Sequence, residues 1–129
     1  MLRALVIDDK AYVRTTVSMI LRAHGFDVTE ADSGTAGLKQ LEKTNFDLAI
    51  VDIYMPGVDG VRVIKLIRER TPKLPVVAMS GAQLGSSGRT ALDYLPMIPD
   101  LVGIPSIKKP FKPDQLMEIV KRAMNADGN

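Results

Sequence analysis

Residues 48–60 read LAIVDIYMPGVDG, an apolar run that ends on a single acid, Asp52, and passes at once into a turn rich in proline and glycine. Four consecutive apolar residues are typical of a strand buried on both faces, as in a parallel sheet. In open α/β sheets, ligands bind beyond the carboxyl ends of the strands. The sequence therefore predicts that Asp52 lies where such folds carry out their chemistry.

Strands and helices are predicted to alternate along the rest of the chain. Continuous or alternating apolar runs indicate strands, and apolar residues at helical spacing indicate helices. The predicted strands are 5–7, 26–31, 46–51, 74–79 and 104–108. The predicted helices are 13–21, 34–41 after a Ser33 cap, 61–67, a short kinked segment from 91, and 113–123 beginning at Pro113. Pro105 places the last strand at a sheet edge, because proline cannot donate to an interior ladder.

This alternation predicts a doubly wound parallel sheet in three α/β/α layers. Five strand–helix repeats suit the flavodoxin-like strand order 2-1-3-4-5, in which the first and third strands flank the ligand crevice. We expect one domain over residues 1–126, a frayed tail at 127–129 and no output domain in the chain.

Composition limits the classes of function. The 17 basic and 15 acidic residues leave a net charge of +2, which is too small to indicate nucleic-acid binding. The absence of cysteine excludes disulfides and thiolate metal sites. The amino-terminal residues lack the features of a signal peptide, and no apolar stretch is long enough to span a bilayer. We therefore expect a cytoplasmic protein with no nucleic-acid or membrane partner.

Polar residues end four of the predicted strands. Asp8 and Asp9 follow the first strand, Asp52 the third, Ser80 the fourth and Lys109 the fifth. In a parallel sheet all of these side chains face one crevice. Carboxylates gathered there repel one another, so a cation is expected among them. Oxygen ligands suit Mg²⁺, whereas zinc does not fit a chain with no cysteine and one histidine.

A carboxylate beside a bound cation is also a competent nucleophile toward phosphorus and would form an aspartyl phosphate. We predict Asp52 as this nucleophile, because it ends the central strand before the turn. Lys109 would neutralise charge on the transferring group, and the Ser80 hydroxyl would donate to one of its oxygens. The backbone carbonyl of Ile53 is a further candidate ligand for the metal.

In their order along the chain, these motifs resemble those of response-regulator receiver domains, such as the chemotaxis regulator and related single-domain regulators. The matching segments are Asp8-Asp9, residues 52–60, Ser80-Gly81-Ala82 and Lys109-Pro110-Phe111, and the resemblance covers essentially the whole chain.

The resemblance implies a role for each matching residue. Asp8 and Asp9 would hold Mg²⁺, and Asp52 would accept phosphate from a phosphohistidine on a sensor histidine kinase or a histidine phosphotransfer protein. Ser80 and Lys109 would contact the phosphoryl group, and the Lys109–Pro110 peptide bond would be cis. A downstream partner would read the surface made by the helix from residue 91, the strand 104–108 and the helix from Pro113.

Three positions depart from the family pattern or are specific to this chain. Receivers usually carry an aromatic switch residue three positions before the lysine, where this chain has Ser106, so the usual rotamer switch is in question. Tyr54 and Ala82 lie two residues after Asp52 and Ser80. Neither offers a carboxylate or amide that could orient an attacking water, so we expect a long-lived aspartyl phosphate.

The leading hypothesis is a stand-alone regulator that binds partners according to its phosphorylation state, as a monomer or a phosphorylation-dependent dimer. It would not be an enzyme in the turnover sense, since it catalyses only its own phosphorylation and dephosphorylation. One alternative is a degenerate receiver that binds partners without phosphate, which Ser106 permits. A metal-dependent phosphohydrolase is the other, but it would normally need a second acid where Tyr54 stands.

Overall fold

The computed structural model of the chain describes residues 1–53, 55, 60–81 and 103–125. The strands are β1 (Leu2–Ile7), β2 (Phe26–Ala31), β3 (Leu48–Asp52), β4 (Val76–Ser80) and β5 (Ser106–Lys108). The helices in this part of the chain are α1 (Ala11–Ala23), α2 (Gly34–Lys43), α3 (Gly60–Arg70) and α4 (Pro113–Met124). None of these helices is long and apolar enough to cross a membrane.

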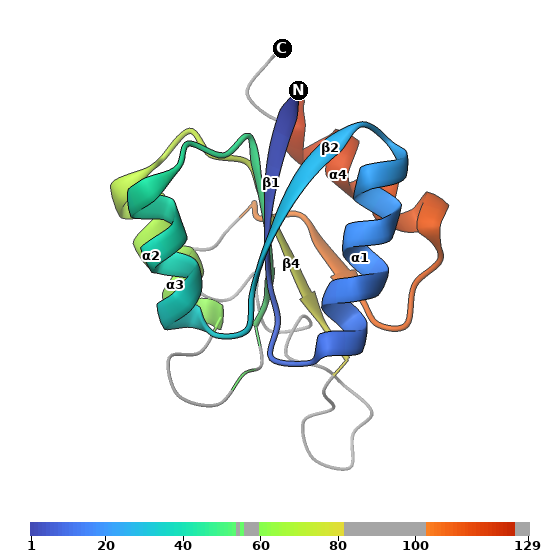
Figure 1. Cartoon of the computed structure of the whole chain (residues 1–129), viewed down its shortest axis with the longest axis horizontal. Helices are drawn as coiled ribbons and strands as arrows, with labels where there is room; N and C mark the ends of the chain where they lie inside the picture. The colour runs from blue at the N-terminus through green and yellow to red at the C-terminus, as the bar shows by residue number, and fades with distance from the viewer. Residues whose placement is uncertain (54, 56–59, 82–102, 126–129) are drawn as a thin grey trace.

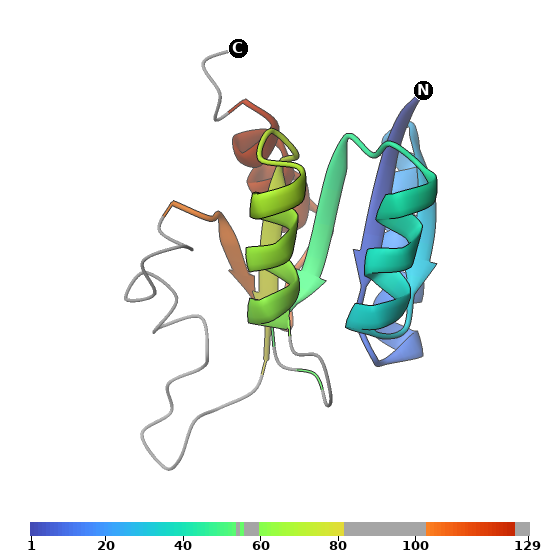
Figure 2. The same cartoon turned by 90° about the vertical axis from the view of Figure 1, so that its left-hand side faces the viewer.

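The strands form one parallel sheet in the order β2-β1-β3-β4-β5. Helices α1 and α4 cover one face, and α2 and α3 cover the other (Figures 1 and 2). The predicted flavodoxin-like topology and its three layers are therefore confirmed. The helix predicted from residue 91 and most of the turn after Asp52 lie outside the described residues.

The sheet separates two apolar clusters, one against each pair of helices. Along β1, Ala4 and Val6 belong to the cluster with α1 and α4, whereas Leu5 and Ile7 belong to the cluster with α2 and α3. Every residue of β3 and of β4 is buried. Burial on both faces is the physical reason that these strands read as unbroken apolar runs.

Several predicted boundaries are confirmed by local contacts. Gly25, with a φ of 88°, follows the end of α1, and the Ser33 Oγ caps α2 by accepting from the Ala36 N–H at 3.1 Å. Pro113 begins α4.

The predicted bounds of four strands were wrong by one to three residues. β3 runs from Leu48 to Asp52 rather than over 46–51, so Asp52 is its last residue. β5 begins at Ser106 rather than 104, because Pro105 has no N–H and contributes only its carbonyl, which accepts from Ala78 at 2.9 Å. β4 begins after Pro75 and includes Ser80. β1 extends back to Leu2, since that residue pairs with Phe26 of β2.

Candidate functional site

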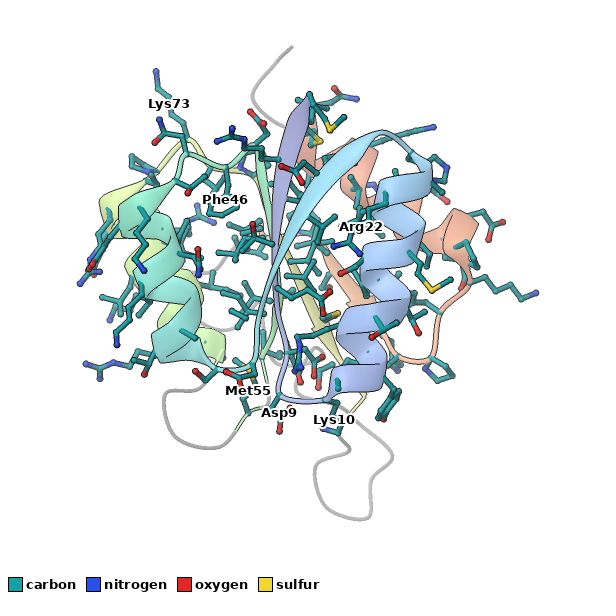
Figure 3. All side chains as sticks on the ribbon, in the orientation of Figure 1. Asp9, Lys10, Arg22, Phe46, Met55 and Lys73 are labelled. Carbon is teal, nitrogen blue, oxygen red and sulfur yellow. The ribbon has the colours of Figure 1, made fainter. Side chains whose placement is uncertain are left out.

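Three carboxylates converge at the carboxyl edge of the sheet. Asp8 and Asp9 follow β1, and Asp52 is the last residue of β3, the strand beside β1. One oxygen from each of the three lies within 4.8 Å of the others. Asp8 and Asp52 are buried, whereas Asp9 is exposed at this end of the molecule (Figure 3). The cluster is therefore buried at its base and exposed to solvent beside Asp9.

Lys109 joins the edge of the sheet to this cluster. Its Nζ donates to Asp8 Oδ2 at 2.8 Å and lies 3.3 Å from Asp52 Oδ2. The Lys109 backbone N–H donates to the Ser80 carbonyl at 3.0 Å, which fixes the origin of the side chain. A Cβ at Gly81 would lie 3.1 Å from the Lys109 Cβ, so a small residue there leaves room for the lysine.

Asp8 is held by its backbone as well as its side chain. Its Oδ1 accepts from the Lys10 N–H at 2.8 Å, and its own N–H donates to Ala31 O at 3.1 Å. The Arg14 Nη1 donates to the Asp8 carbonyl at 2.8 Å, and the Arg14 Nε lies 3.5 Å from Glu30 Oε1 of β2. Arg14 was missed in the sequence, because the orientation of α1 over the β1–α1 turn is set by tertiary packing.

Lys10 was also missed. Its Nζ lies 3.5 Å from Asp9 Oδ1 at the mouth of the cluster. Burial disfavours the charged ammonium, but the Asp9, Asp52 and Asp8 carboxylates outweigh that effect and raise the pKa of Lys10 above its ordinary value. Its place directly after an acid pair was the available sequence signal.

The N-terminus of α3 lies against the backbone of Asp52 and Ile53. A Cβ at Gly60 would overlap the Asp52 carbonyl oxygen and the Ile53 Cα, and would lie 2.6 Å from the Asp52 carbonyl carbon. The Ile53 N–H donates to Met79 O at 3.0 Å, so the peptide after Asp52 is fixed between β4 and α3. Only glycine permits this approach at position 60.

The donor set fits a hard divalent cation. Three carboxylates grouped at a partly open edge supply the oxygen ligands that Mg²⁺ prefers, and the open side admits the waters that Mg²⁺ retains. Asp8, Asp9 and Asp52 would hold the ion. The Ile53 carbonyl follows Asp52 directly and stays a predicted ligand.

A cavity of about 570 Å³ lies beside the carboxylates, between α1 and the segment after β5. Its polar end contains Asp52, Ser80, Lys109 and Lys10. Its other walls include Tyr12, Val13, Thr16, Val17, Pro110 and Phe111. Asp52 is thus buried in the protein but lines this cavity.

Of the remaining predicted residues, some lie at the site, one lies in a separate groove and two lie outside the described residues. Ser80 is buried at the end of β4, and the Lys109–Pro110 peptide bond is cis, as the resemblance implied. Ser106 is half-buried at the start of β5 and lines a separate groove of about 430 Å³ against α4. Tyr54 and Ala82 lie outside the described residues.

Residues 4–121 match the family model of the response regulator receiver domain. The chain belongs to this family. The receiver is 32% identical over 127 residues to the DNA-binding transcriptional regulator NtrC of Klebsiella pneumoniae, an alignment that covers 95% of this chain and 24% of that protein. The chain thus spans about a quarter of the length of the NtrC proteins that it matches.

Solved receiver structures share the fold. Chemotaxis protein CheY4 of Vibrio cholerae superposes with a TM-score of 0.79 at 25% identity, covering 95% of this chain and 98% of that one. The response regulator TrrA of Thermotoga maritima, solved in complex with Mg²⁺-BeF, gives 0.81 at 28% identity, covering 95% and 99%. The chain is thus the receiver domain of a two-component response regulator.

Proposed function

We propose that this receiver is switched by phosphorylation of Asp52, with a phosphohistidine on a sensor histidine kinase or histidine phosphotransfer protein as the donor and Mg²⁺ as the cofactor. One observation carries the proposal. The Lys109 ammonium contacts the buried carboxylates of both Asp8 and Asp52 in a cluster that is open only partly, on the side of Asp9. Such a cluster concentrates charge-neutralising groups where a phosphoryl group would join Asp52.

The transfer is a single displacement at phosphorus. A carboxylate oxygen of Asp52 forms the new P–O bond, while the P–N bond to the donor imidazole breaks and its electron pair stays on the imidazole nitrogen. Lys109 neutralises charge on the transferring oxygens, and the Ser80 hydroxyl donates a hydrogen bond to one of them. When bound, Mg²⁺ supplies further charge neutralisation at the same oxygens.

The output would be a change in partner binding. Phosphorylation biases a two-state surface, and a partner that prefers one state reads the change. We propose that this surface includes β5 and α4 together with the chain that precedes β5. The relatives include CheY4, which this chain matches over 98% of its length, and NtrC, which it matches over only 24%. A receiver can therefore make up nearly a whole protein or one part of a longer one.

The test uses acetyl phosphate as donor. Purified protein is incubated with Mg²⁺ and acetyl phosphate, and its intact mass is compared with that of Asp52→Asn and of Asp27→Asn, a matched change at an exposed residue of β2. We expect one phosphoryl adduct on the wild type and on Asp27→Asn, abolished by EDTA and absent from Asp52→Asn. A wild type that binds Mg²⁺ but gains no adduct would instead support a phosphate-independent binding module.

A further inference from the structure

Lys10 combines a fixed backbone with a movable charge. Its N–H donates to Asp8 Oδ1 at 2.8 Å, and its carbonyl accepts from the Val13 and Arg14 N–H groups, each at 3.1 Å, as α1 begins. Its side chain is 47% exposed, and the ammonium lies 3.5 Å from Asp9 Oδ1. The backbone of Lys10 is therefore fixed at the start of α1, whereas its exposed side chain is free to change rotamer and move the ammonium.

The two lysines divide the carboxylates between them. Lys109 contacts Asp8 and Asp52, and Lys10 contacts Asp9. A divalent cation bound to the same three acids would compete with Lys10 for Asp9, and its charge would repel the ammonium. In the resting protein, Lys10 would therefore oppose metal binding.

Phosphorylation changes this balance. A phosphoryl group on Asp52 replaces one carboxylate charge with a charge of about −1.5 to −2. Lys10 lines the same cavity as Asp52, Ser80 and Lys109, and the Asp52 carboxylate is among the charges that act on its ammonium. The charge that repels the metal ion in the resting protein would then attract the added phosphoryl oxygens.

We propose that Lys10 is a tethered cation with two positions: it pairs with Asp9 and weakens Mg²⁺ binding in the resting state, and it pairs with the phosphoryl group once Asp52 is modified. The second position rests on the function proposed above; the first does not. Lys10 would thereby bias the protein against holding metal without phosphate. It would act as a further phosphoryl-contacting residue beside Lys109 and Ser80.

The test compares Lys10→Met, Lys10→Arg and a control, Lys121→Met, which removes an equal charge from an exposed position in α4. Methionine keeps the length of the side chain and leaves the backbone contacts of Lys10 in place. Mg²⁺ affinity is measured by calorimetry on the unmodified proteins at low ionic strength. Beryllofluoride, as a phosphoryl mimic, is then titrated at saturating Mg²⁺.

We expect Lys10→Met to bind Mg²⁺ about threefold to tenfold more tightly, because a nearby positive charge is lost. For the same reason it should bind beryllofluoride about threefold to tenfold more weakly. Lys10→Arg should resemble the wild type, and Lys121→Met should change neither affinity. If Lys10 were merely structural, its loss would change both affinities in the same direction, and this result would overturn the proposal. An unchanged Mg²⁺ affinity of Lys10→Met would also overturn it.

The two proposals fail in different ways. A wild type that binds Mg²⁺ but not beryllofluoride contradicts phosphoryl acceptance and, with it, the second position of Lys10. The Mg²⁺ affinity of Lys10→Met still decides the first position. Urea unfolding of each variant in EDTA shows whether the compared proteins are equally folded.

Discussion

The Arg14 Nη1 donates a 2.8 Å hydrogen bond to the backbone carbonyl of Asp8. The same guanidinium lies 3.5 Å from Glu30, with its Nε toward the carboxylate. Helix α1 is thereby tied both to the turn that carries two of the acids and to the neighbouring strand β2. Both contacts leave the clustered carboxylates untouched, so we expect Arg14 to act as a positioning residue for Asp8 and Asp9.

Arg14→Ala should lower the free energy of unfolding by about 1–3 kcal/mol, the usual effect of losing a hydrogen bond to a charged group. It should also weaken Mg²⁺ binding severalfold, because the Asp8-Asp9 turn loses its anchor. Urea unfolding and calorimetric Mg²⁺ titration measure the two effects. Arg68→Ala, at an exposed position of α3, is the control. If Arg14→Ala loses stability but keeps its Mg²⁺ affinity, the positioning role is wrong.

Lys109→Met removes the ammonium that lies between two buried carboxylates. In EDTA we expect the free energy of unfolding to fall by about 3 kcal/mol, because Asp8 and Asp52 are left buried without their partner. Saturating Mg²⁺ should raise the stability of this variant more than that of the wild type, since the ion replaces the lost charge. Thermal unfolding with and without Mg²⁺ gives the comparison. Equal stabilisation of both proteins by Mg²⁺ would show that the ion does not replace the charge that Lys109 supplies to Asp8 and Asp52.

Gly37→Ala tests packing against helix propensity. Alanine favours a helix interior by about 1 kcal/mol relative to glycine. A Cβ at position 37, however, would overlap the Ile7 Cδ1 and lie 2.8 Å from the Ile7 Cγ1. We expect a net destabilisation of about 1–2 kcal/mol, because overpacking outweighs propensity.

The double variant Gly37→Ala/Ile7→Val removes the overlapping Cδ1 methyl. It should recover part of the stability lost by Gly37→Ala, so the two changes should be non-additive in a double-mutant cycle. Additive losses in urea unfolding would show that Ile7 is not the obstacle.

Ser18 is buried in α1, and its Oγ has no hydrogen-bond partner within the described part of the chain. Ser18→Ala should raise the free energy of unfolding by about 1 kcal/mol, because it removes an unsatisfied hydroxyl and improves helix propensity. Urea unfolding measures the change, with Thr15→Ala on the exposed side of the same helix as a control for propensity. A loss of stability in Ser18→Ala alone would show that the hydroxyl has a partner, such as a buried water.

The aspartyl phosphate is expected to decay slowly, since Tyr54 and Ala82 offer no group to orient an attacking water. Tyr54→Asn should shorten its lifetime severalfold by supplying a side-chain amide at that position. Phosphorylated protein is freed of donor, and the decay of the adduct is followed by mass. Fast decay of the wild type that Tyr54→Asn leaves unchanged would refute the expectation.

Much of the site could be predicted from sequence because its information is local. A strand buried on both faces must be apolar along its whole length, so the acid that ends it is conspicuous. Asp8, Asp52 and Ser80 were found in this way, and the parallel topology then placed them at one edge. The resemblance to receivers added the roles, and the cis bond before Pro110 is present in the structure.

Tertiary structure alone decided which further contacts hold the predicted acids in place. Whether Arg14 reaches the Asp8 carbonyl and Glu30 depends on how α1 is rotated over the sheet, which the apolar pattern of the helix does not specify in detail. The tight fit of Gly37 against the Ile7 side chain likewise arises from how closely α2 packs on β1. Apolar runs and strand ends are properties of a few neighbouring residues, whereas ion pairs and close contacts join segments that only the packed fold brings together.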